Sequence, residues 1–123
     1  MSQVLLYVAA GLTGLWGISH LFATMGAVAG FGDISTDNRR VITMEWITEG
    51  VALISVAAFV GVTAAIEPHA HLSSAVFAVA IATLVALAVV SIFTGFRIAF
   101  LPYRLCPFIF GLSAVLIALG AWS

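Results

Sequence analysis

Four long apolar stretches limit what this chain can fold into. They cover residues 4–29, 41–66, 72–97 and 105–122, and each reaches or approaches the roughly 20 residues that an α-helix needs to cross about 30 Å of hydrocarbon. The connections between them are too short to hold a second domain. We therefore predict a single all-α domain over residues 1–123, an integral membrane bundle of four transmembrane helices.

The composition agrees with a lipid environment and excludes some partners. Hydrophobic residues make up 63% of the chain and charged residues 7%, whereas soluble domains are about half apolar and a quarter charged. The four basic residues are all arginines and the net charge is −1, so no basic surface is expected for nucleic acid. The predicted partners are the lipid bilayer and a lipophilic small molecule, and a homo-oligomer stays open.

The arginines predict the orientation of the bundle. Arg39 and Arg40 flank the first connection, Arg97 and Arg104 flank the third, and neither terminus carries a basic residue. The positive-inside rule then places both arginine-bearing connections in the cytoplasm and both termini outside. The opening MSQVLLYVAA lacks the basic start of a signal peptide, so we expect a retained helix in a multi-pass protein of a bacterial inner (plasma) membrane.

Two carboxylates stand at the start of the second apolar stretch, in VITMEWITEG. Glu45 and Glu49 lie four residues apart and would share one face of a helix. The apolar part that follows covers only about 24 Å, so a full crossing draws Glu49 into the membrane. Asp37 and Asn38 are the predicted N-caps of a helix that begins near Arg39.

The first apolar stretch offers a partner for these carboxylates. In an antiparallel hairpin that turns between residues 34 and 35, His20 faces Glu49 and Thr24 faces Glu45. Polar and aromatic residues of this stretch recur at helical spacing and form one ridge. The ridge consists of Thr13, Trp16, His20 and Thr24.

Ionisable residues inside a membrane usually face a bundle interior and serve a function. The third stretch adds Thr94 and Arg97 at the same cytoplasmic end, and the following connection adds Tyr103. The predicted site has Glu49, His20 and Glu45 as acid–base candidates, and Arg97, Trp16, Thr24, Thr94, Trp46 and Tyr103 as ligand-binding candidates.

Simpler roles stay open for the charged residues of this site. Glu45 could be an interfacial carboxylate paired with Arg39, Arg40 or Arg97. Arg97 and Arg104 could serve topology alone, with their heads reaching the interface. Glu49 and His20 could form a structural ion pair that locks the first two helices together.

The aromatic and small residues also have simpler roles. Trp46, Tyr103 and Trp122 fit anchoring at the membrane interface better than stacking on a substrate. The single Cys106 is expected to be a buried small residue. Three glycines of the first stretch favour close helix packing: Gly11, Gly14 and Gly17.

The predicted function is binding of a lipophilic small molecule, of quinone or isoprenoid type, in the cytoplasm-side pocket. One alternative is a membrane-embedded acid–base enzyme, such as an isomerase, cyclase or epoxide hydrolase, because a carboxylate beside an imidazole can exchange a proton. Another is a proton-coupled exporter. No metal is expected, because metal binding needs three or four ligands, and His20, Glu45 and Glu49 would form a minimal, carboxylate-rich set without a second histidine in the membrane. The cofactor stays open, with quinone as the one named candidate.

The chain resembles a known family in layout and in one phrase. Four short spans, GLWGISHLF in the first of them and arginines at the cytoplasmic ends are similar to the DoxX-like group of small bacterial membrane proteins. The resemblance implies a four-helix fold and quinone-linked or accessory redox roles, but no catalytic residue of that group maps onto MEWITEG. In size the chain is also similar to small multidrug-resistance transporters, which carry a glutamate in the first helix where this sequence has His20.

Overall fold

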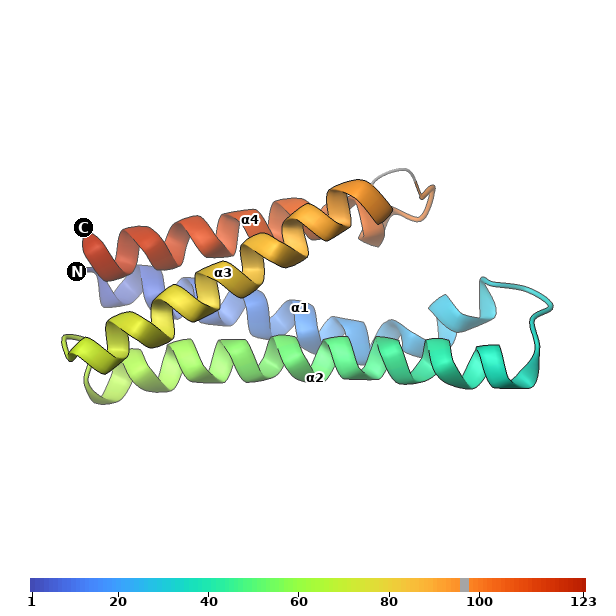
Figure 1. The fold of residues 1–123 in the computed structure, drawn as a ribbon, viewed down its shortest axis with the longest axis horizontal. Helices are drawn as coiled ribbons and strands as arrows, with labels where there is room; N and C mark the ends of the chain where they lie inside the picture. Colours follow the sequence, from blue (N-terminus) through green and yellow to red (C-terminus); the bar gives the residue numbers. More distant parts are fainter. Residues whose placement is uncertain (96–97) are drawn as a thin grey trace.

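The computed structural model describes residues 1–95 and 98–123. These residues form four α-helices and no β-strand, and all four helices are long and apolar enough to cross a membrane. The predicted all-α bundle of four transmembrane helices is therefore confirmed. In chain order the helices are α1 (Gln3–Ala29), α2 (Thr36–Ile66), α3 (His71–Thr94) and α4 (Leu101–Trp122) (Figure 1).

The start of α2 differs from the prediction. The helix begins at Thr36, and its N-cap is Ser35, whose hydroxyl accepts a hydrogen bond from the Asn38 N–H at 3.1 Å. Ser is as good an N-cap as Asp or Asn, and this choice leaves Asp37 in the first turn, where a carboxylate suits the helix dipole. The prediction of Asp37 or Asn38 as the cap was wrong.

The two helices at the third connection also have different bounds from those predicted. The third helix ends at Thr94, with Gly95 as its C-cap, and the predicted last residues 96–97, which include Arg97, lie outside the described residues. The fourth helix begins at Leu101 instead of residue 105. Proline fits the first turn of a helix, so Pro102 starts α4 early rather than interrupting it.

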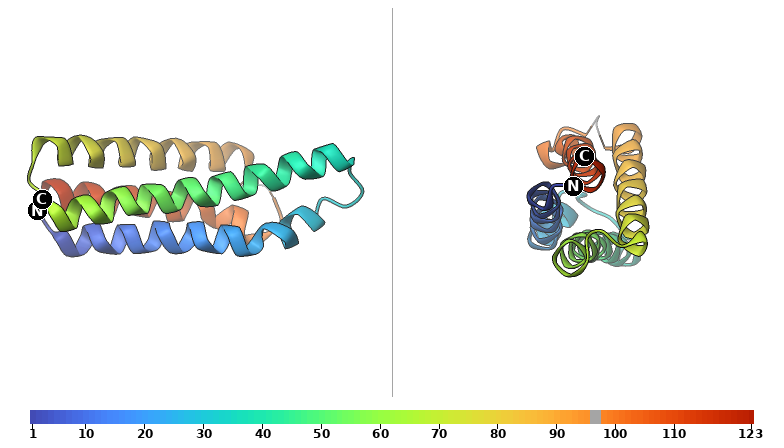
Figure 2. Two further views of the ribbon diagram at one scale, coloured as in Figure 1. Left: turned by 90° about the horizontal axis from the view of Figure 1, so that it is seen from below. Right: turned by 90° about the vertical axis from the view of Figure 1, so that its left-hand side faces the viewer.

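Each helix runs antiparallel to the next, and the four form a ring in which α4 returns to α1 (Figure 2). The first and second helices pack together most extensively, and the second and third least. Both termini and the α2–α3 connection lie at one end, opposite the other two connections (Figure 1). The N-terminal ammonium of Met1 donates to the Ser123 carbonyl, and the Ser2 N–H donates to the Gly120 carbonyl at 2.8 Å.

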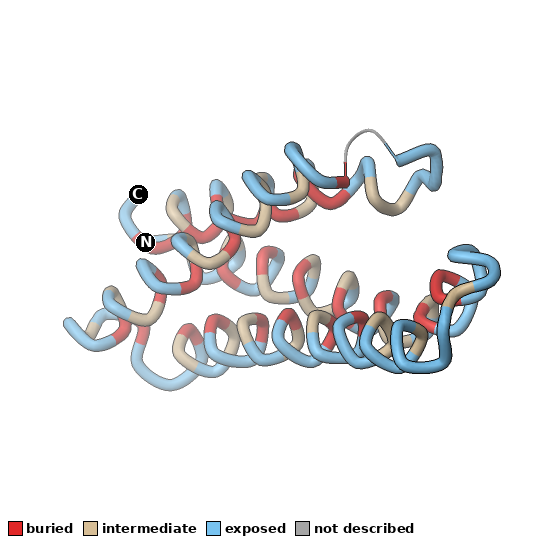
Figure 3. Tube along the Cα trace, turned by 45° about the vertical axis from the view of Figure 1, so that its right-hand side comes forward, coloured by how far each residue is buried: buried red, intermediate tan, exposed pale blue. Residues whose placement is uncertain are grey.

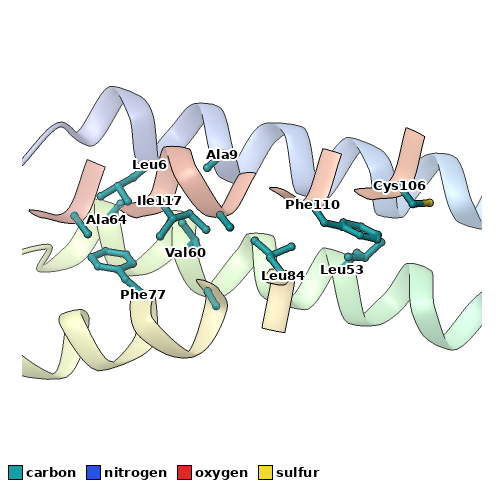
Figure 4. Close-up of a cluster of buried hydrophobic side chains, with 13 residues drawn as sticks. Leu6, Ala9, Leu53, Val60, Ala64, Phe77, Leu84, Cys106, Phe110 and Ile117 are labelled. Atoms are coloured by element: carbon teal, nitrogen blue, oxygen red, sulfur yellow. The ribbon is translucent and has the colours of Figure 1, made fainter. Parts of the chain in front are cut away.

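The interior is a layered apolar core. Buried side chains from all four helices meet along the bundle axis, and the inward faces of the helices carry the buried residues (Figures 3 and 4). The outer surface is apolar as well: Phe22 is 87% exposed, Phe93 81% and Ile66 77%. Such a surface suits contact with lipid rather than water. The largest fully buried side chains are Leu6, Leu53, Val60, Phe77, Leu84, Phe110 and Ile117.

The closest approach of α1 and α2 is a crossing of two glycines. A Cβ atom at Gly17 would lie 2.8 Å from the Gly50 carbonyl oxygen, and one at Gly50 would lie 2.6 Å from Cδ2 of Leu21. Gly14 is also near α2, because its Cβ would lie 3.3 Å from that of Ala57. The predicted role in close helix packing is therefore confirmed for Gly14 and Gly17. It is wrong for Gly11, because a Cβ atom added there would have nothing within 4 Å.

We expect Gly17→Ala to destabilise the bundle by about 1–3 kcal/mol, the usual cost of overpacking. The new methyl group would meet backbone of α2, which can yield only if the helices separate. The measurement is unfolding in detergent micelles. Gly11→Ala is the control, because it gains up to about 1 kcal/mol of helix propensity and meets nothing. Equal stability of the two variants would contradict the glycine crossing.

Candidate functional site

The glycine crossing brings His20 and Glu49 together. His20 lies one turn after Gly17 on α1, and Glu49 directly precedes Gly50 on α2. The Nε2 atom of His20 is 3.1 Å from Oε2 of Glu49. The prediction that these side chains face one another across the hairpin is confirmed.

This contact joins a buried group to a partly exposed one. The side chain of His20 is 9% exposed and that of Glu49 39%. The contact does not have the geometry of a hydrogen bond, and Nε2 has no other hydrogen-bond partner. It is an ion pair when the imidazole is protonated. The pair can therefore link the bundle interior to its surface, with Glu49 on the outer side.

The arginines near the start of α2 have partners other than Glu45. Arg39 donates to the Gly32 carbonyl at 2.9 Å, and Arg40 lies 3.6 Å from Asp37. Glu45 is exposed and has no ion pair among the described residues. The interpretation of Glu45 as the partner of Arg39 or Arg40 was therefore wrong, and a partner at Arg97 lies outside the described residues.

Aromatic rings extend the site from His20. The indole of Trp46 stacks on the His20 ring, with centroids 4.3 Å apart and planes at 20°. Tyr103 meets Trp46 edge-on at 5.5 Å, and Phe100 meets Tyr103 at 5.8 Å. Trp46 is 8% exposed. This burial contradicts its interpretation as an interfacial anchor and makes it a support that fixes the orientation of the imidazole.

A small pocket lies between α1, α2 and the first turns of α4. Its volume is about 110 Å³, and an apolar cavity of about 150 Å³ is known to hold benzene. The pocket is therefore smaller than the space that encloses a benzene ring, so only part of a single ring, such as the edge that carries a carbonyl, fits inside it. Its lining consists of Trp16, Ser19, His20, Ala23, Trp46, Pro102, Tyr103 and Cys106.

Several polar atoms of α1 and α4 are buried without a hydrogen-bond partner. Besides Nε2 of His20, they are the indole nitrogen of Trp16 and the Thr13 hydroxyl on α1, and the Ser113 hydroxyl on α4. Hydroxyls on helices commonly donate to the carbonyl four residues earlier, as Ser19, Thr24, Thr43, Ser55, Thr83, Ser91 and Thr94 do here. Thr13 and Ser113 therefore keep their hydroxyls free at an energetic cost.

The structure brings some predicted site residues together and leaves others apart. Trp16, His20, Trp46 and Tyr103 line the pocket. Thr24 is buried but donates to the His20 carbonyl at 2.9 Å and lies outside the lining. Thr94 is exposed and donates to Val90. No described residue of α3 belongs to this lining, so the pocket belongs to the other three helices.

Of the pocket residues on α4, Tyr103 was predicted from the sequence, but Pro102 and Cys106 were not. Pro102 and Cys106 line the pocket one turn apart, and the Cys106 thiol donates to the Pro102 carbonyl at 3.3 Å. Cys106 is buried, as expected, but at the pocket wall rather than only in the core. The signal that could have found them is the spacing of Pro102, Tyr103 and Cys106, which puts all three on one side of a helix.

A second, larger cavity adjoins the small pocket. It has a volume of about 440 Å³ and lies between the end of α1 and the segment that leads into α4. Tyr103 belongs to both linings. The other lining residues are apolar or glycine: Gly26, Ala27, Gly30, Phe31, Ile98 and Phe100.

The described residues were searched for a metal site, and the chain was compared with known proteins. Within residues 1–95 and 98–123, no three His, Cys, Asp or Glu side chains cluster closely enough to hold a metal ion. Comparisons of the chain with family models, curated proteins and solved structures found no match. The resemblance to DoxX-like proteins therefore stays a prediction.

We expect His20→Leu and Glu49→Gln to show coupled effects on stability. Each single change removes one member of a contacting pair, so the double variant should be more stable than the sum of the singles predicts, by about 0.5–3 kcal/mol. Unfolding of all four proteins in micelles measures this. The control is Glu45→Gln, expected within about 0.5 kcal/mol of wild type because the side chain is exposed. Additive effects would contradict the pairing.

Proposed function

We propose that this protein binds a lipophilic small molecule of quinone or isoprenoid type and holds its carbonyl head in the small pocket. The observation that carries the proposal is the Trp16 indole N–H, a buried donor in the pocket wall that has no oxygen or nitrogen acceptor and only the sulfur of Cys106, a weak acceptor, beside it. An unsatisfied buried donor costs about 1–3 kcal/mol, and a ligand oxygen would remove that cost. A cationic head would not, because it has no acceptor to offer.

The shape and composition of the pocket support a planar head. Trp16, Trp46 and Tyr103 give it aromatic walls, and His20 lies parallel to the Trp46 ring. Flat rings stack favourably on such walls. A volume of about 110 Å³ encloses only part of one ring, which favours a single ring over a fused ring system. Apolar walls with few polar groups are typical of small-molecule sites.

Acid–base catalysis on the bound molecule is the second candidate, and the His20–Glu49 contact favours it. His20 lies in the pocket wall, while Glu49 contacts it from the more exposed side. Proton transfer between Glu49 and a ligand oxygen through the imidazole would require this 3.1 Å contact to adopt hydrogen-bond geometry when the ligand binds. The double variant His20→Leu with Glu49→Gln separates this role from a structural lock, because a lock would keep function and a relay would lose turnover although stability returns.

The proposed location is a bacterial inner membrane with both termini outside. The N-terminal turns of α2 and α4, which carry Arg39, Arg40 and Arg104, lie at one end of the bundle, and both termini lie at the other (Figure 1). This arrangement supports the positive-inside orientation. The site would then open towards the cytoplasmic half of the bilayer.

Cysteine labelling tests the orientation. In a Cys106→Ala background, a cysteine at Ser35 should react with an impermeant maleimide only when the reagent reaches the cytoplasmic side. A cysteine at His69, which is exposed in the α2–α3 connection, should react only from outside. The opposite pattern at both positions would reverse the proposed topology.

We expect Trp16→Phe to weaken binding of a methylated benzoquinone at least fivefold, because phenylalanine keeps an aromatic wall but lacks the N–H donor. Equilibrium dialysis with protein in lipid nanodiscs measures the affinity. Trp122→Phe is the matched control, since Trp122 is 55% exposed at the far end of α4 and should bind like wild type. Equal affinity of the two variants would remove the main support for a carbonyl head at Trp16.

A further inference from the structure

We propose that the larger cavity holds an apolar tail of the same ligand, so that the protein selects a single-ring carbonyl head carrying a chain of limited length. This inference rests on the proposed function and adds the ligand class to it. It begins from Tyr103, which belongs to the walls of both the 110 Å³ pocket and the 440 Å³ cavity. The shared wall makes the two spaces neighbours, so one molecule would have to pass only Tyr103 to occupy both.

The two spaces differ in the chemistry of their walls. The small pocket contains the Trp16 donor and the imidazole of His20. Apart from the Tyr103 phenol, the described lining of the larger cavity has no polar side chain, because it consists of glycine, alanine, isoleucine and phenylalanine. Polar groups at one end and apolar walls at the other fit a molecule that is polar only at its head.

The larger cavity is partly open, because Phe31, Ile98 and Phe100 in its lining are 40–49% exposed, so its volume gives an approximate size for the enclosed part of the tail. The larger cavity has four times the volume of the small pocket, about 440 Å³ against about 110 Å³. If about 150 Å³ holds the six carbons of benzene, about 440 Å³ holds roughly three such groups. A chain of about three isoprene units would fill it, and a longer chain would extend into the bilayer.

Gly26 offers a way to close this cavity without disturbing the fold. It lines the cavity, and a Cβ atom built on it would meet nothing within 4 Å. Leucine is a better helix former than glycine, so Gly26→Leu should keep α1 intact and place its side chain in the tail space. Gly30 is less suitable, because its Cβ would lie 3.3 Å from the Ala27 carbonyl oxygen.

The experiment compares benzoquinones with no tail and with one to five isoprene units, in nanodiscs that contain wild-type protein or Gly26→Leu. Empty nanodiscs of the same lipids correct for partition into the bilayer. Wild type should gain at least tenfold in corrected affinity from no tail to three units and little beyond. Gly26→Leu should bind the tail-less quinone within twofold of wild type and lose the gain from the tail.

Gly11→Leu is the matched control. Gly11 is also on α1, is exposed and has nothing within 4 Å of its Cβ position, but it does not line the cavity. It should keep the dependence on tail length. This control separates filling of the cavity from a general effect of replacing a lipid-facing glycine.

The possible failures are distinguishable. If wild type binds the tail-less quinone but gains nothing from a tail, the tail site is refuted and the proposed function stands; a bilayer acyl chain that fills the cavity would give this result. If Gly26→Leu retains the gain, the tail lies elsewhere and the inference is refuted as well. If no quinone binds, with or without a tail, the proposed function falls and this inference falls with it.

Discussion

The close crossing of α1 and α2 at Gly17 and Gly50 is the contact on which the site depends. Lipid tails are as apolar as the helix surfaces, so helices in a bilayer gain little from hiding those surfaces and are held by close packing instead. Two positions without side chains let the backbones approach until a Cβ at Gly17 would lie 2.8 Å from the opposite carbonyl oxygen. His20 lies one turn after Gly17, and Glu49 directly precedes Gly50. The close packing of the two glycines therefore brings Nε2 of His20 to 3.1 Å from Oε2 of Glu49.

The groups of the site follow one another from this crossing towards the end of the bundle, first charged, then aromatic, then apolar. The His20–Glu49 pair comes first, then the stacked ring of Trp46, then Tyr103 and the apolar cavity beyond it. Each group supports the next: Trp46 holds the imidazole plane, and Tyr103 holds the edge of Trp46. A head group bound in the small pocket would contact His20, Trp46 and Tyr103, and a tail that extended past Tyr103 would contact the apolar cavity.

The spans could be predicted because length and apolar composition suffice to identify a helix that crosses a membrane. The starts of α2 and α4 could not, since several residues near each start are compatible with the first turn of a helix. Ser35, Asp37 and Asn38 all cap helices well, and only the path of the connection selects Ser35. Pro102 similarly permits either a break or a first turn, and the structure has the first turn.

The sequence by itself determined the pairing of His20 with Glu49, because a short connection and the constant rise of an α-helix set which levels of a hairpin meet. It could not determine which face of α2 or α4 turns inward. Most residues of these helices are apolar, so hydrophobic periodicity is a weak guide to the rotation about their axes. Only packing in three dimensions buried Trp46 against His20 and brought Pro102, Tyr103 and Cys106 into the pocket wall, because the fit of side chains between helices, rather than their order along the chain, decides that rotation.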